Sequence, residues 1–113
     1  MLAFLFTDKY TFLVYNISVE VEVTLSKKAE KDLRKIPRNI SILFDLWVQT
    51  IEEDGYEAMK KRRGYRDHKL IGDRAGQRSS SLSRSYRVIY DLNENFEVLI
   101  IEVLEVNKHE YKK

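Results

Sequence analysis

The stretch "SVEVEVTLSKKAEKDLRKIP", residues 18–37, changes its hydrophobic period from two residues to helical spacing at Ser26. Before Ser26, Val and Leu alternate with Glu and Thr, which predicts a strand over residues 18–25 with one face exposed to water. Ser26 is a favourable N-cap because its side-chain oxygen can accept a hydrogen bond from a free amide of the first helical turn. After Ser26 the apolar residues recur at helical spacing as far as Pro37, which ends the predicted helix.

A second helix is predicted for residues 38–53, ending before Gly55. Its apolar side chains fall on a single stripe: Ile40, Leu43, Phe44, Trp47, Val48 and Ile51. A helix buries such a stripe against another layer, so we expect the two helices to pack as a pair on a sheet. The largest side chains of the stripe, Phe44 and Trp47, are therefore predicted to belong to the core.

Three further strands are predicted in the second half of the chain, at residues 77–82, 85–92 and 97–106. The last of them is almost continuously apolar over residues 98–103, as in a central strand that is buried on both faces. The resulting order, β-α-α-β-β-β, predicts an α+β fold with an antiparallel-rich sheet and two N-terminal helices packed on one face. We assign residues 18–113 to this domain. Residues 1–17 form either an N-terminal extension or an added hairpin at the sheet edge.

The composition excludes several kinds of site. With 113 residues the chain suits one domain, and with no cysteine it has neither disulfides nor a thiolate metal site. Two histidines far apart in sequence argue against zinc, so no cofactor is predicted. The apolar start is interrupted at Asp8 and Lys9, well short of the roughly 20 apolar residues that span a bilayer. We therefore expect a cytoplasmic protein without a membrane partner.

The positive charge is concentrated in one part of the chain. The formal net charge is only +2, yet residues 60–90 contain 10 Lys and Arg side chains against two acidic ones, Asp67 and Asp73. Such a block predicts affinity for a polyanion such as RNA, and a solvated basic face is the alternative.

Arg87 is the candidate site residue whose position the strand pattern predicts most directly. Val88 and Tyr90 are expected to face the core, so alternation places Arg87 on the opposite, solvent-facing side of the sheet. An arginine on a strand is held rigidly and can bind a phosphate group in bidentate fashion. The alternative interpretation is a structural salt bridge to a carboxylate of the sheet such as Glu102.

These features suit the cleavage of RNA by its own 2′-hydroxyl. That reaction needs a base for the hydroxyl proton, cations for the charge on the phosphoryl oxygens and an acid for the leaving 5′-oxygen, but no metal. We expect Arg78, Ser80 and His109 to lie on the side of the sheet that carries Arg87. The groups proposed for catalysis are His68, Arg87, His109 and Tyr111.

Other side chains of this half are predicted to bind the RNA chain. Tyr86 or Tyr111 is a candidate for stacking on an exposed base. The serine triplet at residues 79–81 is expected to divide between the two faces of its strand, so no Ser–His–Asp site is predicted. The cations proposed to contact RNA are Lys69, Arg74, Arg78, Arg84 and Lys108.

Two segments resemble the RelE/ParE superfamily of toxins from type II toxin–antitoxin systems: "GYRDHKLIGDRAGQRSSSLSRSYRVIYDL" (residues 64–92) and "VLIIEVLEVNKHEY" (residues 98–111). Within them, "SYRVIYDL" fits the aromatic–Arg–x–x–Tyr strand of the family. "RDHKLIG" is similar to the DHxLxG stretch of the YafQ and RelE-like branches, and "NKHEY" to their short C-terminal motif. The resemblance covers residues 18–111.

The resemblance implies a metal-independent endoribonuclease that cuts mRNA on the ribosome and is held inactive by a cognate antitoxin protein. It implies that Arg87 stabilises the phosphate in the transition state and that His68 acts as the base or contacts the RNA. His109 falls where relatives keep a catalytic His or Arg, Tyr111 falls near their terminal aromatic residue, and Arg78 stands close to a lysine of some members.

This chain departs from the pattern at "RSSSLS" (residues 78–83), which lacks the Lys-x-Lys or His of some active members. That departure leaves the identity of the general base open. The alternative function is that of ParE-like relatives, which share the fold but inhibit DNA gyrase without RNase activity.

Overall fold

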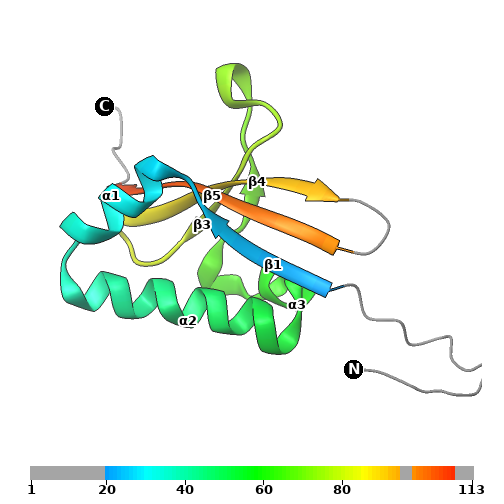
Figure 1. Cartoon of the computed structure of the whole chain (residues 1–113), viewed down its shortest axis with the longest axis horizontal. Helices are drawn as coiled ribbons and strands as arrows, with labels where there is room; N and C mark the ends of the chain where they lie inside the picture. Colours follow the sequence, from blue (N-terminus) through cyan, green and yellow to red (C-terminus); the bar gives the residue numbers. More distant parts are fainter. Residues whose placement is uncertain (1–19, 95–97, 109–113) are drawn as a thin grey trace, which may run out of the picture.

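The computed structural model describes residues 20–94 and 98–108, and it places a five-stranded sheet over a layer of helices (Figure 1). The helices are α1 (Lys27–Lys35), α2 (Arg38–Asp54) and α3 (Tyr56–Lys61), with short 3-10 turns η2 (Arg63–Tyr65) and η3 (Gly72–Arg74). The strands are β1 (Glu20–Leu25), β2 (His68–Lys69), β3 (Arg78–Ser81), β4 (Tyr86–Glu94) and β5 (Val98–Lys108). Their order in the sheet is β1-β5-β4-β3-β2.

The predicted α+β fold is confirmed. β1 pairs with β5 in parallel, while the β5–β4, β4–β3 and β3–β2 pairs are antiparallel, so the sheet is antiparallel-rich as expected. β2 was not predicted, because its two residues are too few to show a period; it exists because His68 and Lys69 pair with β3. The interpretation of residues 1–17 falls outside the described residues.

The start of α1 is tied to an irregularity in β5. The Ser26 hydroxyl accepts a hydrogen bond from the Ala29 amide (3.0 Å), as predicted for an N-cap, and donates one to the Leu104 carbonyl (2.8 Å). Leu104 is the extra residue of a β-bulge, since Glu105 lies opposite Ile89 whereas Val103 lies opposite the next residue of β4. One side chain therefore caps the helix and satisfies the carbonyl of a bulged residue.

Beyond the bulge, α1 takes the place of a neighbouring strand. β1 pairs with β5 only as far as Val103, and the Asp32 carboxylate accepts a hydrogen bond from the Val106 amide at 3.0 Å. A backbone amide that the end of β1 would leave without a partner is thus satisfied by a helix side chain. This contact closes part of the edge that β5 would otherwise expose.

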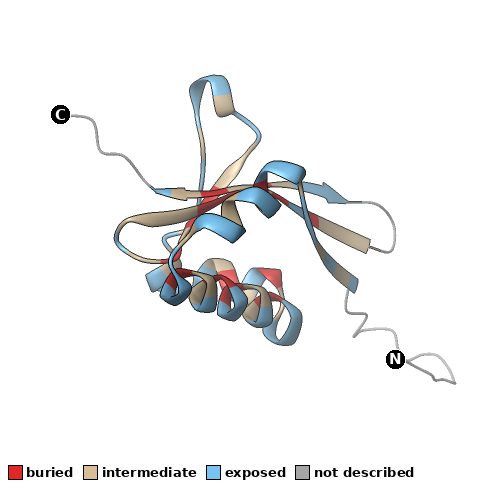
Figure 2. Cartoon of the chain, turned by 60° about the vertical axis from the view of Figure 1, so that its left-hand side comes forward, coloured by how far each residue is buried: buried red, intermediate tan, exposed pale blue. Residues whose placement is uncertain are grey.

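The main core lies between α2 and the sheet (Figure 2). The predicted stripe of α2 supplies four buried residues, Ile40, Phe44, Trp47 and Ile51, and the ring centroids of Trp47 and Tyr90 lie 5.5 Å apart. The prediction that Phe44 and Trp47 are core residues is therefore confirmed.

A buried carboxylate lies beside this core. The Asp67 side chain is fully buried, and its Oδ1 accepts hydrogen bonds from Nε (2.8 Å) and Nη2 (2.7 Å) of Arg78. Its Oδ2 accepts from the hydroxyls of Ser80 (2.5 Å) and Tyr90 (2.6 Å). A buried carboxylate without such donors would be strongly unfavourable, so these three residues make the position of Asp67 possible.

The hydroxyl of Tyr90 continues this network to α3, since it lies 3.0 Å from the hydroxyl of Tyr56. Burial, followed by the hydrogen bond to Asp67, raises the pKa of Tyr90 above its ordinary value of 10.0. The phenol therefore stays protonated and donates to Asp67, while the Tyr56 hydroxyl donates to the Tyr90 oxygen.

Replacing Ser26 by Ala should lower the free energy of unfolding by about 1–2 kcal/mol, because the helix loses its cap and the bulge loses a donor. The matched control is Ser41→Ala, which removes only a local, exposed hydrogen bond to the Arg38 carbonyl. It should change stability by less than about 0.5 kcal/mol. Urea unfolding of both variants measures the difference, and equal losses would contradict a structural role for the Ser26–Leu104 contact.

The raised pKa of Tyr90 predicts a loss of stability in alkali. Below pH 10 both folded and unfolded chains keep the phenol proton; above it only the unfolded chain releases the proton, which favours unfolding. In Tyr90→Phe this contribution is absent, so its free energy of unfolding should fall less steeply between about pH 9 and about pH 11. Denaturant titrations at both pH values test this, and equal slopes for the two proteins would contradict it.

Candidate functional site

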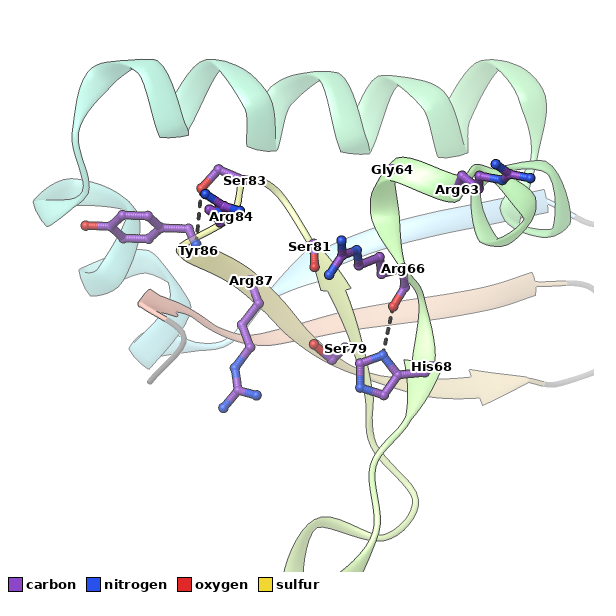
Figure 3. A pocket seen from close by; sticks show the side chains of 10 residues that line it. All are labelled: Arg63, Gly64, Arg66, His68, Ser79, Ser81, Ser83, Arg84, Tyr86 and Arg87. Atoms are coloured by element: carbon purple, nitrogen blue, oxygen red, sulfur yellow. Dashed lines mark hydrogen bonds between the residues drawn. The ribbon is translucent and has the colours of Figure 1, made fainter. Parts of the chain in front are cut away.

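A cavity of about 790 Å³ opens beside β2, β3 and β4, on the side where Ser79, Ser81 and Arg87 point away from the helices (Figure 3). Its walls also include the segment around η2 that precedes β2. Four arginines and one histidine line this pocket, and none of its lining residues in the described part of the chain is a carboxylate. The lining residues are Arg63, Gly64, Arg66, His68, Ser79, Ser81, Ser83, Arg84, Tyr86 and Arg87.

The pairing of β3 with β4 determines which side chains reach the pocket. Ser81 lies opposite Arg87, and residues directly opposite in an antiparallel pair share one face of the sheet. Arg78 lies opposite Tyr90, and Ser80 lies opposite a buried core valine, so both point toward the helices. The expectation that Arg78 and Ser80 lie on the same face of the sheet as Arg87 was therefore wrong. The register places both side chains on the opposite face.

Arg87 carries an unpaired charge within the described part of the chain. Its Nε is buried without a hydrogen-bond partner, and no carboxylate of the described residues forms an ion pair with its guanidinium. Glu102, the alternative partner, lies opposite Asp91, well along β4 from Arg87. A cation held by a strand without a carboxylate partner is suited to bind an anion from solution.

The surface around Arg87 is less open than predicted. Ile89, two residues farther along the same face, is fully buried. Its neighbour in register, Glu105, forms an ion pair with Arg74 from the loop between β2 and β3, which rises on the side of the sheet away from α2 (Figure 1). The pocket therefore occupies only the part of this face nearest Ser81 and Arg87.

His68 stands in the pocket in a defined tautomer. Its Nδ1 lies 2.7 Å from the Arg66 carbonyl oxygen, which can only accept, so Nδ1 carries the proton (Figure 3). In the neutral ring Nε2 is then the nitrogen with a free electron pair. An imidazole nitrogen with a free electron pair is suited to take a proton from a bound hydroxyl.

The sequence did not identify Arg63 or Arg66 as pocket residues. Arg63 and Arg66 come from a segment without an apolar period, where the sequence shows no face. The serines do divide between two faces, as predicted, and Ser79 and Ser81 point into the pocket. Alternation alone predicts this division, but only the register of β3 on β4 shows which serines share a face with Arg87.

The other predicted RNA contacts are dispersed. Arg84 lines the pocket, and Lys69 follows His68 on β2 and is exposed, on the opposite side of that strand. Arg74 donates to the Gln77 side chain (2.8 Å) and pairs with Glu105. Lys108 is exposed.

Tyr86 lies near the end of β5, beyond which the predicted C-terminal site residues follow in sequence. The Tyr86 ring packs against the core and points away from Arg87, so it is not placed to stack on a bound base (Figure 3). Lys108 lies opposite Tyr86 in the sheet, and β5 therefore ends beside the pocket. His109 and Tyr111 lie outside the described residues.

The described residues contain neither a candidate metal cluster nor a helix that could span a membrane. Residues 20–94 and 98–108 contain no cluster of three or more His, Asp or Glu side chains arranged to hold a metal ion. No helix within the same ranges has the length and apolar character that crossing a bilayer requires.

Several solved structures with the same fold are toxins or toxin–antitoxin complexes. The YoeB/ParE toxin from Agrobacterium tumefaciens is 13% identical, with a TM-score of 0.62 over 79% of this chain and 99% of that one. The toxin in the E. coli DinJ–YafQ toxin–antitoxin complex is 17% identical, with a TM-score of 0.61 over 80% and 94%. For the YoeB–YefM complex from Staphylococcus aureus the values are 18%, 0.58, 81% and 99%.

Sequence comparison identifies the family. No characterised protein with a curated sequence matches this chain significantly. The family model described as "ParE toxin of type II toxin-antitoxin system, parDE" matches residues 23–110, which include every described residue of the pocket. The chain therefore belongs to the ParE toxin family of type II toxin–antitoxin systems, within the RelE/ParE superfamily.

Proposed function

We propose that this toxin is a metal-independent endoribonuclease that cleaves mRNA on the ribosome and thereby inhibits translation. The observation that supports this most is that Arg87, which has no ion-pair partner among residues 20–94 and 98–108, shares one pocket with His68, and that no described carboxylate lines this pocket. Such a pocket attracts a polyanion. Within it, Arg87 can bind a phosphate group of the substrate while His68 acts as a base on the same substrate.

The reaction begins when Nε2 of His68 removes the proton from a 2′-hydroxyl. The 2′-oxygen attacks the adjacent phosphorus, and the bond from phosphorus to the 5′-oxygen breaks. The products are a 2′,3′-cyclic phosphate and a 5′-hydroxyl. Arg87 stabilises the charge that develops on the phosphoryl oxygens, a contribution of about 10²–10³ in rate for one well-placed donor.

The leaving 5′-oxygen needs a proton. Among the described residues His68 is the only histidine, and no carboxylate lines the pocket. We assign the acid to His109 or Tyr111, in keeping with the sequence resemblance. They follow Lys108, which lies opposite the pocket residue Tyr86.

The other pocket residues hold the RNA chain. Arg63, Arg66 and Arg84 are proposed to bind the phosphates on either side of the scissile bond, which makes affinity depend on salt. The hydroxyls of Ser79 and Ser81 are proposed to bind phosphate or ribose oxygens, at positions where some relatives carry Lys or His. Arg78 is not included, since its charge is already paired with Asp67.

The remaining predicted contacts, Lys69, Arg74 and Lys108, would act at the margin of the RNA path. We also propose that a cognate antitoxin binds and inhibits this toxin. This rests on the family and on two of the similar structures, which are complexes of YafQ with DinJ and of YoeB with YefM.

Inhibition of DNA gyrase is the second candidate function, and the match to a ParE model favours it. Gyrase inhibition is a binding function that requires no acid–base chemistry. The tautomer of His68 and the position of Arg87 in the same pocket therefore favour RNA cleavage. Gyrase inhibition predicts DNA damage and intact transcripts when the chain is expressed.

Arg87→Ala should slow mRNA cleavage about 10²–10³-fold, and His68→Gln about 10²–10⁴-fold, because the first removes the phosphate ligand and the second the base. Arg34→Ala is the matched control, since it removes the same charge from an exposed position on α1. Cleavage of a defined mRNA on translating ribosomes measures the rates, and circular dichroism confirms folding.

Full activity of folded Arg87→Ala and His68→Gln would contradict the proposal. Loss of growth arrest in these variants with intact transcripts and reduced DNA damage would instead assign the pocket to the gyrase function.

A further inference from the structure

The residue between two pocket residues points the opposite way. Arg66 and His68 line the pocket, whereas the side chain of Asp67 is fully buried on the helix side of the sheet. The chain thus crosses the sheet edge here with alternate side chains on its two sides. The contacts that hold the Asp67 side chain therefore also fix the positions of Arg66 and His68.

Asp67 is held by two different strands. Arg78 and Ser80 of β3 donate to it, and so does Tyr90 of β4, over distances of 2.5–2.8 Å. The same strands present Ser79, Ser81 and Arg87 to the pocket on their opposite face. The Asp67 carboxylate therefore links the position of His68 to the strand that carries Arg87.

The backbone beside Asp67 is unusual in a way that serves His68. Arg66 has φ of 45°, the left-handed region that non-glycine residues rarely adopt, and its carbonyl is the acceptor of the His68 Nδ1–H. A residue keeps such a conformation only where its surroundings over-determine it. The anchored side chain of Asp67, one residue later, supplies that constraint.

We propose that Asp67 is a positioning residue for catalysis. By anchoring residues 66–68 to β3 and β4, it holds the Arg66 carbonyl against Nδ1 of His68 and leaves Nε2 directed to the substrate. This inference rests on the proposed function for the role of His68, but the effect of Asp67 on the histidine ring can be measured without substrate.

Asp67→Asn tests this, because the amide has nearly the same shape but can no longer accept from both Arg78 and the two hydroxyls as a carboxylate does. In the unmodified full chain, ¹⁵N NMR of neutral His68 should show the Nδ1–H tautomer. In Asp67→Asn we expect a mixture of tautomers. The kcat for cleavage on ribosomes should fall by about 10–100-fold with KM changed less than about threefold, since the phosphate-binding arginines remain.

Two further variants separate positioning from stability. Ser80→Ala removes one donor to Asp67 and should give an intermediate tautomer mixture even where Asp67→Asn folds poorly. Asp32→Asn removes a partly buried carboxylate that binds the Val106 amide on α1, and should lower stability without altering the His68 tautomer.

An unchanged tautomer and unchanged kcat in folded Asp67→Asn, or in Ser80→Ala where Asp67→Asn does not fold, would overturn the proposal. Full cleavage by His68→Gln would refute the role of His68 in the proposed function. The tautomer measurement would then still decide whether Asp67 positions the ring.

Discussion

The buried Asp67 carboxylate accepts hydrogen bonds from Arg78, Ser80 and Tyr90, and the arrangement of side chains on both faces of the sheet depends on these contacts. A buried ion pair adds little net stability compared with apolar packing, yet removal of one partner costs about 3–5 kcal/mol. Such a pair therefore defines a position more than it strengthens a fold. Here it fixes the entry into β2, and with it the pocket.

The register of β3 on β4 gives two arginines opposite roles. Arg78 faces the helices and is neutralised by Asp67, while Arg87 faces the pocket without an ion-pair partner among the described residues. The first belongs to the structure of the site and the second to its chemistry. Charge in this half of the chain is thus not a uniform basic surface, because Arg78 and Arg74 are neutralised by ion pairs within the structure, whereas other arginines line the pocket.

Much of the fold could be predicted because it is written in local patterns: the alternation of residues 18–25, the cap at Ser26 and the stripe of α2. Arg87 and His68 could be found from a motif and from strand alternation. The placement of Arg78 could not, since a one-residue change in register exchanges the faces and register depends on tertiary contacts. Arg63 and Arg66 were missed for a related reason, as their segment is placed by the anchor of Asp67 and shows no period of its own.

The most direct test of the account is the chemistry of the RNA ends produced in cells that express the chain. Ribosome-associated transcripts are collected after induction and their new 5′ and 3′ ends are mapped and identified chemically. Cleavage by the 2′-hydroxyl predicts 5′-hydroxyl ends together with 2′,3′-cyclic phosphates, on ribosome-bound mRNA and absent in Arg87→Ala. Intact transcripts accompanied by DNA breaks, or ends that carry a 5′-phosphate, would contradict it.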